Sequence, residues 1–170
     1  MASFIRSSLG NIAGFTACVC MMGYALYTQH FLGLEPCPLC VLQRLAVIAL
    51  GALFLIAAIH AAGPVGRSLY AILLAVVAMA GSGVAARHVW LQNLPSDQVP
   101  TCGPGLDFML DTFRLTEVLE MVLSGSGECA EVKWSLFGLS MPAWTLIAFL
   151  CLGVFGIWAN LLPRPVSRLP

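Results

Sequence analysis

Four of the seven cysteines in this chain have the spacing and surroundings of reactive thiols. Cys37 and Cys40 form a Cys-x-x-Cys pair, a spacing found in dithiol redox motifs. Cys102 and Cys129 lie further along the chain, each beside a glycine-rich stretch. Four cysteines permit three disulfide connectivities, and local pairing would join the first two and the last two. All four are therefore candidate catalytic residues for thiol–disulfide exchange.

Arg44 lies four residues after Cys40, so it shares the same helical face one turn further into an apolar segment. The Cys-x-x-Cys pair stands at the start of that segment, and a helix N-terminus favours a thiolate over a thiol. If the segment lies in a membrane, a guanidinium at its edge costs free energy unless it has a partner. We expect that partner to be the Cys40 thiolate or the oxygen of a polar ligand at the bilayer surface. An arginine that only reaches toward lipid head groups is the alternative.

His88 and Gln92 form a second polar pair, near the end of another apolar segment. They are four residues apart and share a helical face, at the same depth as Cys40 and Arg44. Their side chains can donate hydrogen bonds to a ligand with a carbonyl group. His88 and Gln92, with Arg44, are therefore candidate cofactor-binding residues. The alternative is a polar fringe that anchors a helix end at the membrane surface.

The composition places these residues in a membrane protein. Of the 170 residues, 59% are hydrophobic and only 9% are charged, whereas soluble domains have about 25% charged residues. The formal net charge is zero, so the chain lacks the basic footprint of a nucleic-acid-binding protein. Four stretches contain no charged residue: 7–34, 45–66, 68–86 and 134–163. Since about 20 helical residues cross a bilayer core, the sequence predicts an all-α membrane protein with a four-transmembrane-helix bundle.

The whole chain, 1–170, is predicted to be a single membrane domain. The four spans are expected at roughly 9–28, 41–61, 69–90 and 142–162. A Gly-Pro turn joins the second and third spans. The two loops on the other side are a short one, roughly 29–40, and a long one, roughly 91–141.

Basic residues predict the orientation of the bundle, because cytoplasmic loops collect Lys and Arg. Four arginines lie near the two termini and in the Gly-Pro turn: Arg6, Arg67, Arg164 and Arg168. Arg114 and Lys133 oppose this assignment weakly, since long loops cross a membrane largely regardless of their charge. Both termini are thus expected in the cytoplasm. The four candidate cysteines then face an oxidising space, in which disulfides form and persist.

The long loop is expected to contain an amphipathic helix between Cys102 and Cys129. Four apolar residues recur there at i, i+3, i+4 and i+7: Leu115, Val118, Leu119 and Val122. We expect this helix to lie at the membrane interface. Its polar face is mainly acidic, unlike that of most interfacial helices, so a simple cap on the bundle is the alternative.

The other three cysteines, Cys18, Cys20 and Cys151, lie within apolar spans, where a thiol acts as a small hydrophobic group. No redox role is expected for them. A four-thiolate zinc site normally needs two close cysteine pairs, and Cys102 and Cys129 are far apart in the sequence. No metal is therefore expected.

These motifs together resemble the bacterial disulfide bond formation protein B (DsbB) family, over essentially the whole chain. Besides the four spans, the matching features are the Cys37-x-x-Cys40 motif followed by Gln43-Arg44, His88-x-x-x-Gln92, Cys102, the run Ser126-Gly127-Glu128-Cys129-Ala130-Glu131, Trp134, Gly138-Leu139 and Met141-Pro142-x-Trp144.

The resemblance implies an enzyme of the bacterial inner membrane, a quinone-dependent protein-disulfide oxidoreductase. It would reoxidise a periplasmic DsbA-like thiol oxidase, which sustains disulfide bond formation in secreted proteins. The resemblance also implies that Cys102 and Cys129 form the disulfide attacked by the partner, with the mixed disulfide at Cys102. Electrons would reach the first pair when Cys129 contacts Cys37, and would leave from the Cys40 thiolate to ubiquinone or menaquinone. Arg44 would hold the quinone oxygen.

Three other protein classes should have different sequence features. A protein similar to vitamin K epoxide reductase should have its Cys-x-x-Cys motif near the last span. A channel or carrier should have more polar residues inside its spans. A non-enzymatic four-span adaptor would use both disulfides as permanent staples, but a Cys-x-x-Cys ring closes too short a loop to be a good staple. The adaptor is the main alternative to the enzyme.

Overall fold

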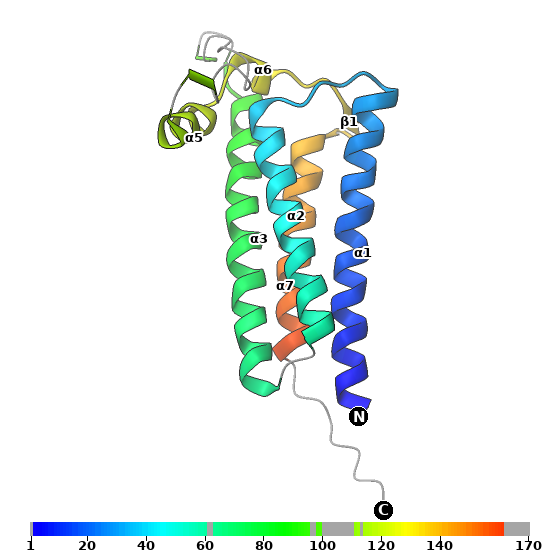
Figure 1. The fold of residues 1–170 in the computed structure, drawn as a ribbon. Helices are drawn as coiled ribbons and strands as arrows, with labels where there is room; N and C mark the ends of the chain where they lie inside the picture. Colours follow the sequence, from blue (N-terminus) through cyan, green and yellow to red (C-terminus); the bar gives the residue numbers. More distant parts are fainter. Residues whose placement is uncertain (1, 61–62, 96–97, 100–110, 113, 162–170) are drawn as a thin grey trace, which may run out of the picture.

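Four long helices run side by side in the computed structural model, which describes residues 2–60, 63–95, 98–99, 111–112 and 114–161 (Figure 1). They are α1 (Ala2–Phe31), α2 (Pro38–His60), α3 (Pro64–Gln92) and α7 (Met141–Leu161). Each contains a segment long and apolar enough to cross a bilayer. The predicted all-α membrane protein with a four-transmembrane-helix bundle is therefore confirmed. Arg6, Arg164 and Arg168, which helped to predict its orientation, have side chains outside the described part.

Proline at the start of α2 and α3 explains why both helices begin a few residues before the predicted spans, 41–61 and 69–90. Pro38 and Pro64 stand at the first helical positions, where the fixed φ of proline suits a helix and its missing N–H is not needed. Gly63 precedes α3 as its N-cap, with an extended backbone. In α2 this early start places Cys37 directly before the helix and Cys40 in its first turn.

Aromatic side chains packed against glycines form the core of the bundle. Phe54 of α2 and Phe149 of α7 are both fully buried. A Cβ atom at Gly14 of α1 or Gly81 of α3 would lie only 2.7 Å from a ring carbon of Phe54 or Phe149, respectively. Small residues allow such close approach between membrane helices. Large hydrophobic side chains point outward along the same helices, as expected of a surface in lipid; examples are Ile48, Ile59, Met79 and Val154.

Gly81→Ala is expected to destabilise the bundle, because its new methyl group would collide with the Phe149 ring. Overpacking of this kind costs about 1–3 kcal/mol of unfolding free energy. Gly83→Ala is the matched control, since a Cβ atom at Gly83 would meet no atom within 4 Å and the helical context is the same. Thermal unfolding in detergent should show a lower midpoint for Gly81→Ala only. Equal midpoints for the two variants would contradict this packing.

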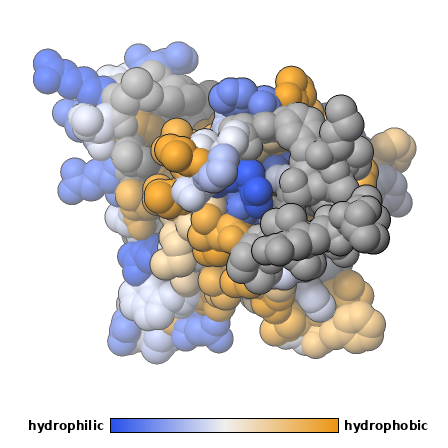
Figure 2. Space-filling model, turned by 90° about the horizontal axis from the view of Figure 1, so that it is seen from below, coloured by the Kyte–Doolittle hydropathy of each residue, from blue (hydrophilic) through white to orange (hydrophobic). Residues whose placement is uncertain are grey.

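Polar side chains join three helices at the end of the bundle where α1 begins. The Asn11 and Asn160 amides exchange hydrogen bonds of 3.2 and 3.0 Å between α1 and α7. The Arg67 guanidinium of α3 donates to the backbone carbonyl oxygen of Asn160 at 2.9 Å. Hydrophilic residues come to the surface between hydrophobic ones in a view onto this end (Figure 2). These hydrogen bonds hold α1, α3 and α7 together.

Short elements cover the opposite end of the bundle (Figure 1). They are α5 (Leu115–Ser124), α6 (Gly127–Ala130) and an antiparallel hairpin of β1 (Ser135–Leu136) and β2 (Leu139–Ser140). Phe137 and Gly138 form the hairpin turn and have φ angles of 52° and 78°. Positive φ at both central residues is what a two-residue type I′ turn requires. The hairpin leads the chain directly into α7.

The amphipathic helix expected in the long loop is present as α5. Val118 and Val122 are buried in a second core cluster with Leu39 of α2 and Leu91 of α3. Arg87 of α3 donates to the carbonyl oxygens of the last two residues of α5, at 3.3 and 3.1 Å. These contacts dock α5 against the end of the bundle. Its placement at a membrane interface stays a prediction.

Candidate functional site

The Cys-x-x-Cys pair lies where the short loop enters α2. The Sγ atoms of Cys37 and Cys40 are 3.0 Å apart, and both residues have free thiols. The Cys40 backbone N–H also points at the Cys37 sulfur, at 3.4 Å. Cys37 is buried, whereas Cys40 is partly exposed. The first turn of α2 thus holds the two sulfurs close enough for a disulfide to form after a small rotation of the side chains.

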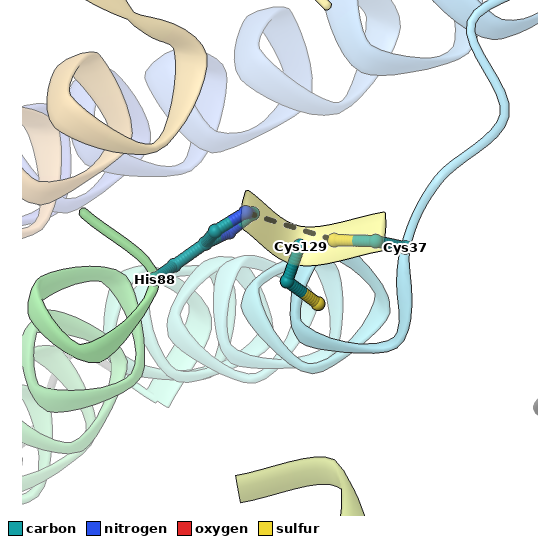
Figure 3. A group of neighbouring side chains, drawn as sticks. All are labelled: Cys37, His88 and Cys129. Atoms are coloured by element: carbon teal, nitrogen blue, oxygen red, sulfur yellow. Dashed lines mark hydrogen bonds between the residues drawn. The ribbon is translucent and has the colours of Figure 1, made fainter. Parts of the chain in front are cut away.

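Cys129 joins this pair from a distant part of the sequence. It lies in α6, is fully buried, and its backbone N–H donates to the Ser126 carbonyl oxygen at 2.9 Å. Its sulfur, the Cys37 sulfur and a ring nitrogen of His88 all lie within 4.8 Å of one another (Figure 3). The structure therefore places a thiol of the long loop next to the Cys-x-x-Cys pair, which is the contact needed for thiol–disulfide exchange.

The proton distribution between these thiols is unequal. Hydrogen bonds with Cys129 and Cys40, together with burial, raise the pKa of Cys37 above that of an ordinary thiol. The hydrogen bond with Cys37 lowers the pKa of Cys129. Cys129 is therefore the more readily ionised thiol of this pair, and the thiolate is the nucleophilic form.

His88 lies next to the Cys37 thiol. It is buried, and its Nε2 atom lies 3.7 Å from the Cys37 sulfur. Its Nδ1 atom lies 3.0 Å from the Gln43 side-chain amide. Sequence reasoning missed Gln43, although its position three residues after Cys40 places both on one face of α2. Gln43 fixes the orientation of the His88 ring.

Arg44 has partners in α1 instead of at the Cys40 sulfur. Its guanidinium donates to the Gln29 side-chain oxygen and, at 3.0 Å, to the Ala25 carbonyl oxygen. The expectation of a Cys40 partner is therefore not met in this structure. The expectation of a polar ligand stays a prediction, because Arg44 also borders a cavity at the site. Gln29 is a further residue that sequence reasoning missed.

A mainly apolar cavity opens beside the sulfurs, between the ends of the long helices. It brings together five of the predicted site residues, namely Cys37, Cys40, Arg44, His88 and Gln92. Its lining also includes residues of α1, α2 and α7 and the residue before β1: Met21, Met22, Thr28, Val47, Met141, Pro142 and Trp134. The Gln92 Oε1 atom is buried and has no hydrogen-bond partner within the described part of the chain.

Cys18, Cys20 and Cys151 do not line this cavity. Cys102 lies outside the described residues, so its predicted pairing with Cys129 stays a prediction. Cys18 is buried in the bundle core, and Cys20 and Cys151 are exposed on α1 and α7. That these three cysteines have no redox role stays a prediction.

Comparisons with known proteins agree on one family. The sequence model of the family described as Disulfide bond formation protein DsbB matches residues 7–159. A protein of Nitrosococcus oceani named Disulfide bond formation protein B is 58% identical over 145 residues, covering 85% of this chain and 86% of that protein. Proteins of the same name from Hahella chejuensis and Methylococcus capsulatus are 50% and 49% identical. They cover 85% and 88% of this chain, and 87% and 92% of their own lengths.

Proposed function

This chain belongs to the disulfide bond formation protein B family, and from that premise we propose that it reoxidises a periplasmic DsbA-like thiol oxidase and passes the electrons to a membrane quinone. Family membership supports a role in disulfide bond formation as a disulfide oxidoreductase. The observation that most favours the specific reaction is the cluster of the Cys37, Cys40 and Cys129 sulfurs beside an apolar cavity. In this proposal Cys129 brings electrons from the long loop, and Cys40, which lines the cavity, passes them to a lipid-soluble oxidant.

Electrons enter, in this proposal, at a disulfide between Cys102 and Cys129. A thiolate of the reduced partner attacks Cys102, and Cys129 leaves as a thiolate. Cys129 then attacks the Cys37 sulfur of the Cys37–Cys40 disulfide, a Cys37–Cys129 bond forms, and Cys40 leaves as a thiolate with the electron pair of the broken bond. The lowered pKa of Cys129 supports its role as leaving group and then as nucleophile. The partner's second thiol attacks the mixed disulfide, which releases oxidised partner and a reduced Cys102. The Cys102 thiolate then attacks Cys129, which re-forms the Cys102–Cys129 disulfide and releases Cys37 as a thiolate. Cys37 and Cys40 re-form their disulfide when two electrons leave them for the acceptor.

The residues around the cavity fit a quinone, which has an apolar ring system and carbonyl oxygens. Arg44, His88 and Gln92 supply hydrogen-bonding groups on a mainly apolar lining. The buried Gln92 amide oxygen has no partner among the described residues. It can accept only from a donor such as a quinol hydroxyl, whereas turning the amide would aim its N–H groups at a quinone carbonyl. A bound quinone would supply an acceptor for two electrons and two protons. Cys40 lies in the same lining and would donate the electrons to that acceptor.

The proposed location is the bacterial inner membrane, with both termini in the cytoplasm. Figure 1 shows α1 beginning and α7 ending at the end opposite α5 and α6. Arg67 lies at the end of the bundle where α1 begins and α7 ends, which agrees with the preference of Lys and Arg for the cytoplasmic side. The sulfur cluster would then face the periplasm, where a thiol oxidase can reach it.

An anaerobic assay tests the proposed reaction. The purified protein is mixed with a reduced DsbA-like oxidase and a quinone, and the loss of quinone absorbance is followed. We expect the protein to reduce the quinone and Cys40→Ser to reduce none above background, because serine cannot form the required disulfide. Exposed Cys151 offers the matched control, and Cys151→Ser should behave as the unaltered protein does. Disulfides that stay oxidised when the reduced partner is supplied would instead favour the structural adaptor.

A further inference from the structure

The sulfur cluster has the composition of a metal site as well as that of a redox site. The Cys37 and Cys129 sulfurs and a His88 ring nitrogen lie within 4.8 Å of one another, and all three residues are buried (Figure 3). The Cys40 sulfur is 3.0 Å from that of Cys37. Two sulfurs and one imidazole thus form a mutually close group, from α6, α3 and the loop before α2, and the Cys40 sulfur of α2 lies beside one member of it, Cys37.

Their spacing is close to that around tetrahedral zinc. A Zn–S bond of about 2.3 Å gives neighbouring sulfur ligands a separation of about 3.8 Å in a tetrahedron. The Cys37 sulfur and His88 Nε2 are already 3.7 Å apart. The two sulfurs of the Cys-x-x-Cys pair, at 3.0 Å, would need to separate by about 0.8 Å to reach that spacing. Rotation of the partly exposed Cys40 side chain can supply this movement.

Gln43 completes the arrangement by orienting the histidine. A histidine that binds metal through Nε2 usually donates its Nδ1–H to an oxygen acceptor, which fixes the ring. The Gln43 amide lies 3.0 Å from His88 Nδ1. The two ends of a glutamine amide are assigned from the hydrogen-bond network, so turning this amide places its oxygen toward Nδ1. His88 Nε2 is then left free to face the sulfurs.

We propose that the reduced protein binds one zinc ion, or a similar thiophilic divalent cation, through Cys37, Cys40, Cys129 and His88. Binding forms three metal–sulfur bonds and one metal–nitrogen bond, and it displaces the protons of those thiols that are not yet ionised. No oxidation state changes. A metal-bound thiolate is no longer free to attack a disulfide or to donate electrons, so the ion should stop turnover until it is removed.

The sequence alone argues against a zinc site of Cys37, Cys40, Cys102 and Cys129, because such a site needs two close cysteine pairs. The fold changes the ligand set, because it brings Cys129 to the first pair and adds His88 from α3. A set of three cysteines and one histidine is common in structural zinc sites. Cys102 is not required.

Cobalt titration of the reduced full-length protein in detergent micelles tests the site. Under anaerobic conditions we expect one Co²⁺ per chain, with thiolate-to-cobalt charge-transfer absorption and the visible bands of tetrahedral cobalt. Zn²⁺ should displace the cobalt and abolish these bands. Oxidation of the thiols to disulfides before the titration should prevent binding. Failure of the reduced protein to give tetrahedral thiolate–cobalt spectra would overturn the proposal.

Variants identify the ligands. Cys129→Ser and Cys37→Ser should each lower the charge-transfer absorption and weaken binding, while Cys20→Ser and Cys151→Ser should leave both unchanged. Gln43→Leu, which keeps all four ligands, should weaken binding by about 10- to 100-fold. Circular dichroism confirms that each variant retains its helices. Unchanged binding in Cys129→Ser, or loss of binding in Cys102→Ser, would show that the ligand set is wrong.

Cobalt binding can be measured whether or not the proposed redox function is right. Only the expected inhibition of quinone reduction by the metal rests on the proposed function. If cobalt does not bind and quinone reduction proceeds, the metal site alone is refuted. If cobalt binds as described and no quinone is reduced, the proposed function alone is refuted. If both hold, Zn²⁺ should stop quinone reduction, and a chelator should restore it.

Discussion

Replacement of Cys129 by serine is expected to abolish electron flow from the thiol oxidase to the quinone. The Cys129 sulfur is the only one from the long loop that the described part of the chain places near Cys37. A serine hydroxyl cannot form or break a disulfide, and loss of a covalent nucleophile costs about a thousandfold or more in rate. We therefore expect the partner-dependent rate of quinone reduction to fall to background.

The matched control for this experiment is Cys18→Ser, because Cys18 is also buried but lies in the core of the bundle. It should retain the rate of the unaltered protein, provided that thermal unfolding shows the bundle intact. Cys129→Ser should still react with the partner at Cys102 and accumulate a mixed disulfide, which non-reducing electrophoresis detects. Partner-dependent quinone reduction at an undiminished rate in Cys129→Ser would contradict the proposed route.

Arg44→Ala is expected to weaken quinone binding by about 10- to 100-fold while leaving exchange with the thiol oxidase intact. A hydrogen bond to a charged group contributes about 1.5–3 kcal/mol, which corresponds to this range. Arg44 borders the cavity from α2, and its two described hydrogen bonds fix its guanidinium against α1. The variant should raise the KM for quinone more than it lowers the rate at saturating quinone.

Two further variants separate the charge of Arg44 from its geometry. Arg44→Lys keeps the charge but loses the planar arrangement of donors, so its KM should lie between those of Arg44→Ala and the unaltered protein. Gln29→Leu removes one anchor of the guanidinium and leaves Arg44 itself in place, so it should produce a smaller rise in KM. A KM for quinone that is the same in Arg44→Ala as in the unaltered protein would exclude Arg44 from quinone binding.

Charge and hydrophobicity were sufficient to predict the bundle from sequence, because the bilayer sets the length of each helix. Residues such as Cys40 and Arg44 could be related to each other because they lie on one helix, where spacing determines the shared face. The contact of Cys129 with Cys37 could not be derived in this way. It depends on how α5 and α6 fold back over the end of the bundle, which no local pattern specifies.

Hydrogen bonds between side chains of different helices could not be predicted from the sequence either. Gln43 gave no signal of its own, and its function in the structure depends on the rotation of α3, which brings His88 to face α2. The partner of Arg44 was predicted to be on the same helix or to be a ligand, but α1 supplies it. Helix rotation follows from the packing of residues such as Gly14 against Phe54, and a hydropathy pattern does not contain that information.

The division of the core into two clusters has a consequence for motion. One cluster lies along the bundle around Phe54 and Phe149, while the other holds Leu39, Val118 and Cys129 at its end. Separate clusters allow separate opening, so the small one can loosen while the large one keeps its packing. Hydrogen exchange should therefore be faster in α5 and α6 than in the middle of α3 and α7. Opening of the end cluster, with the packing around Phe54 and Phe149 intact, would allow the Cys129 sulfur to change partners.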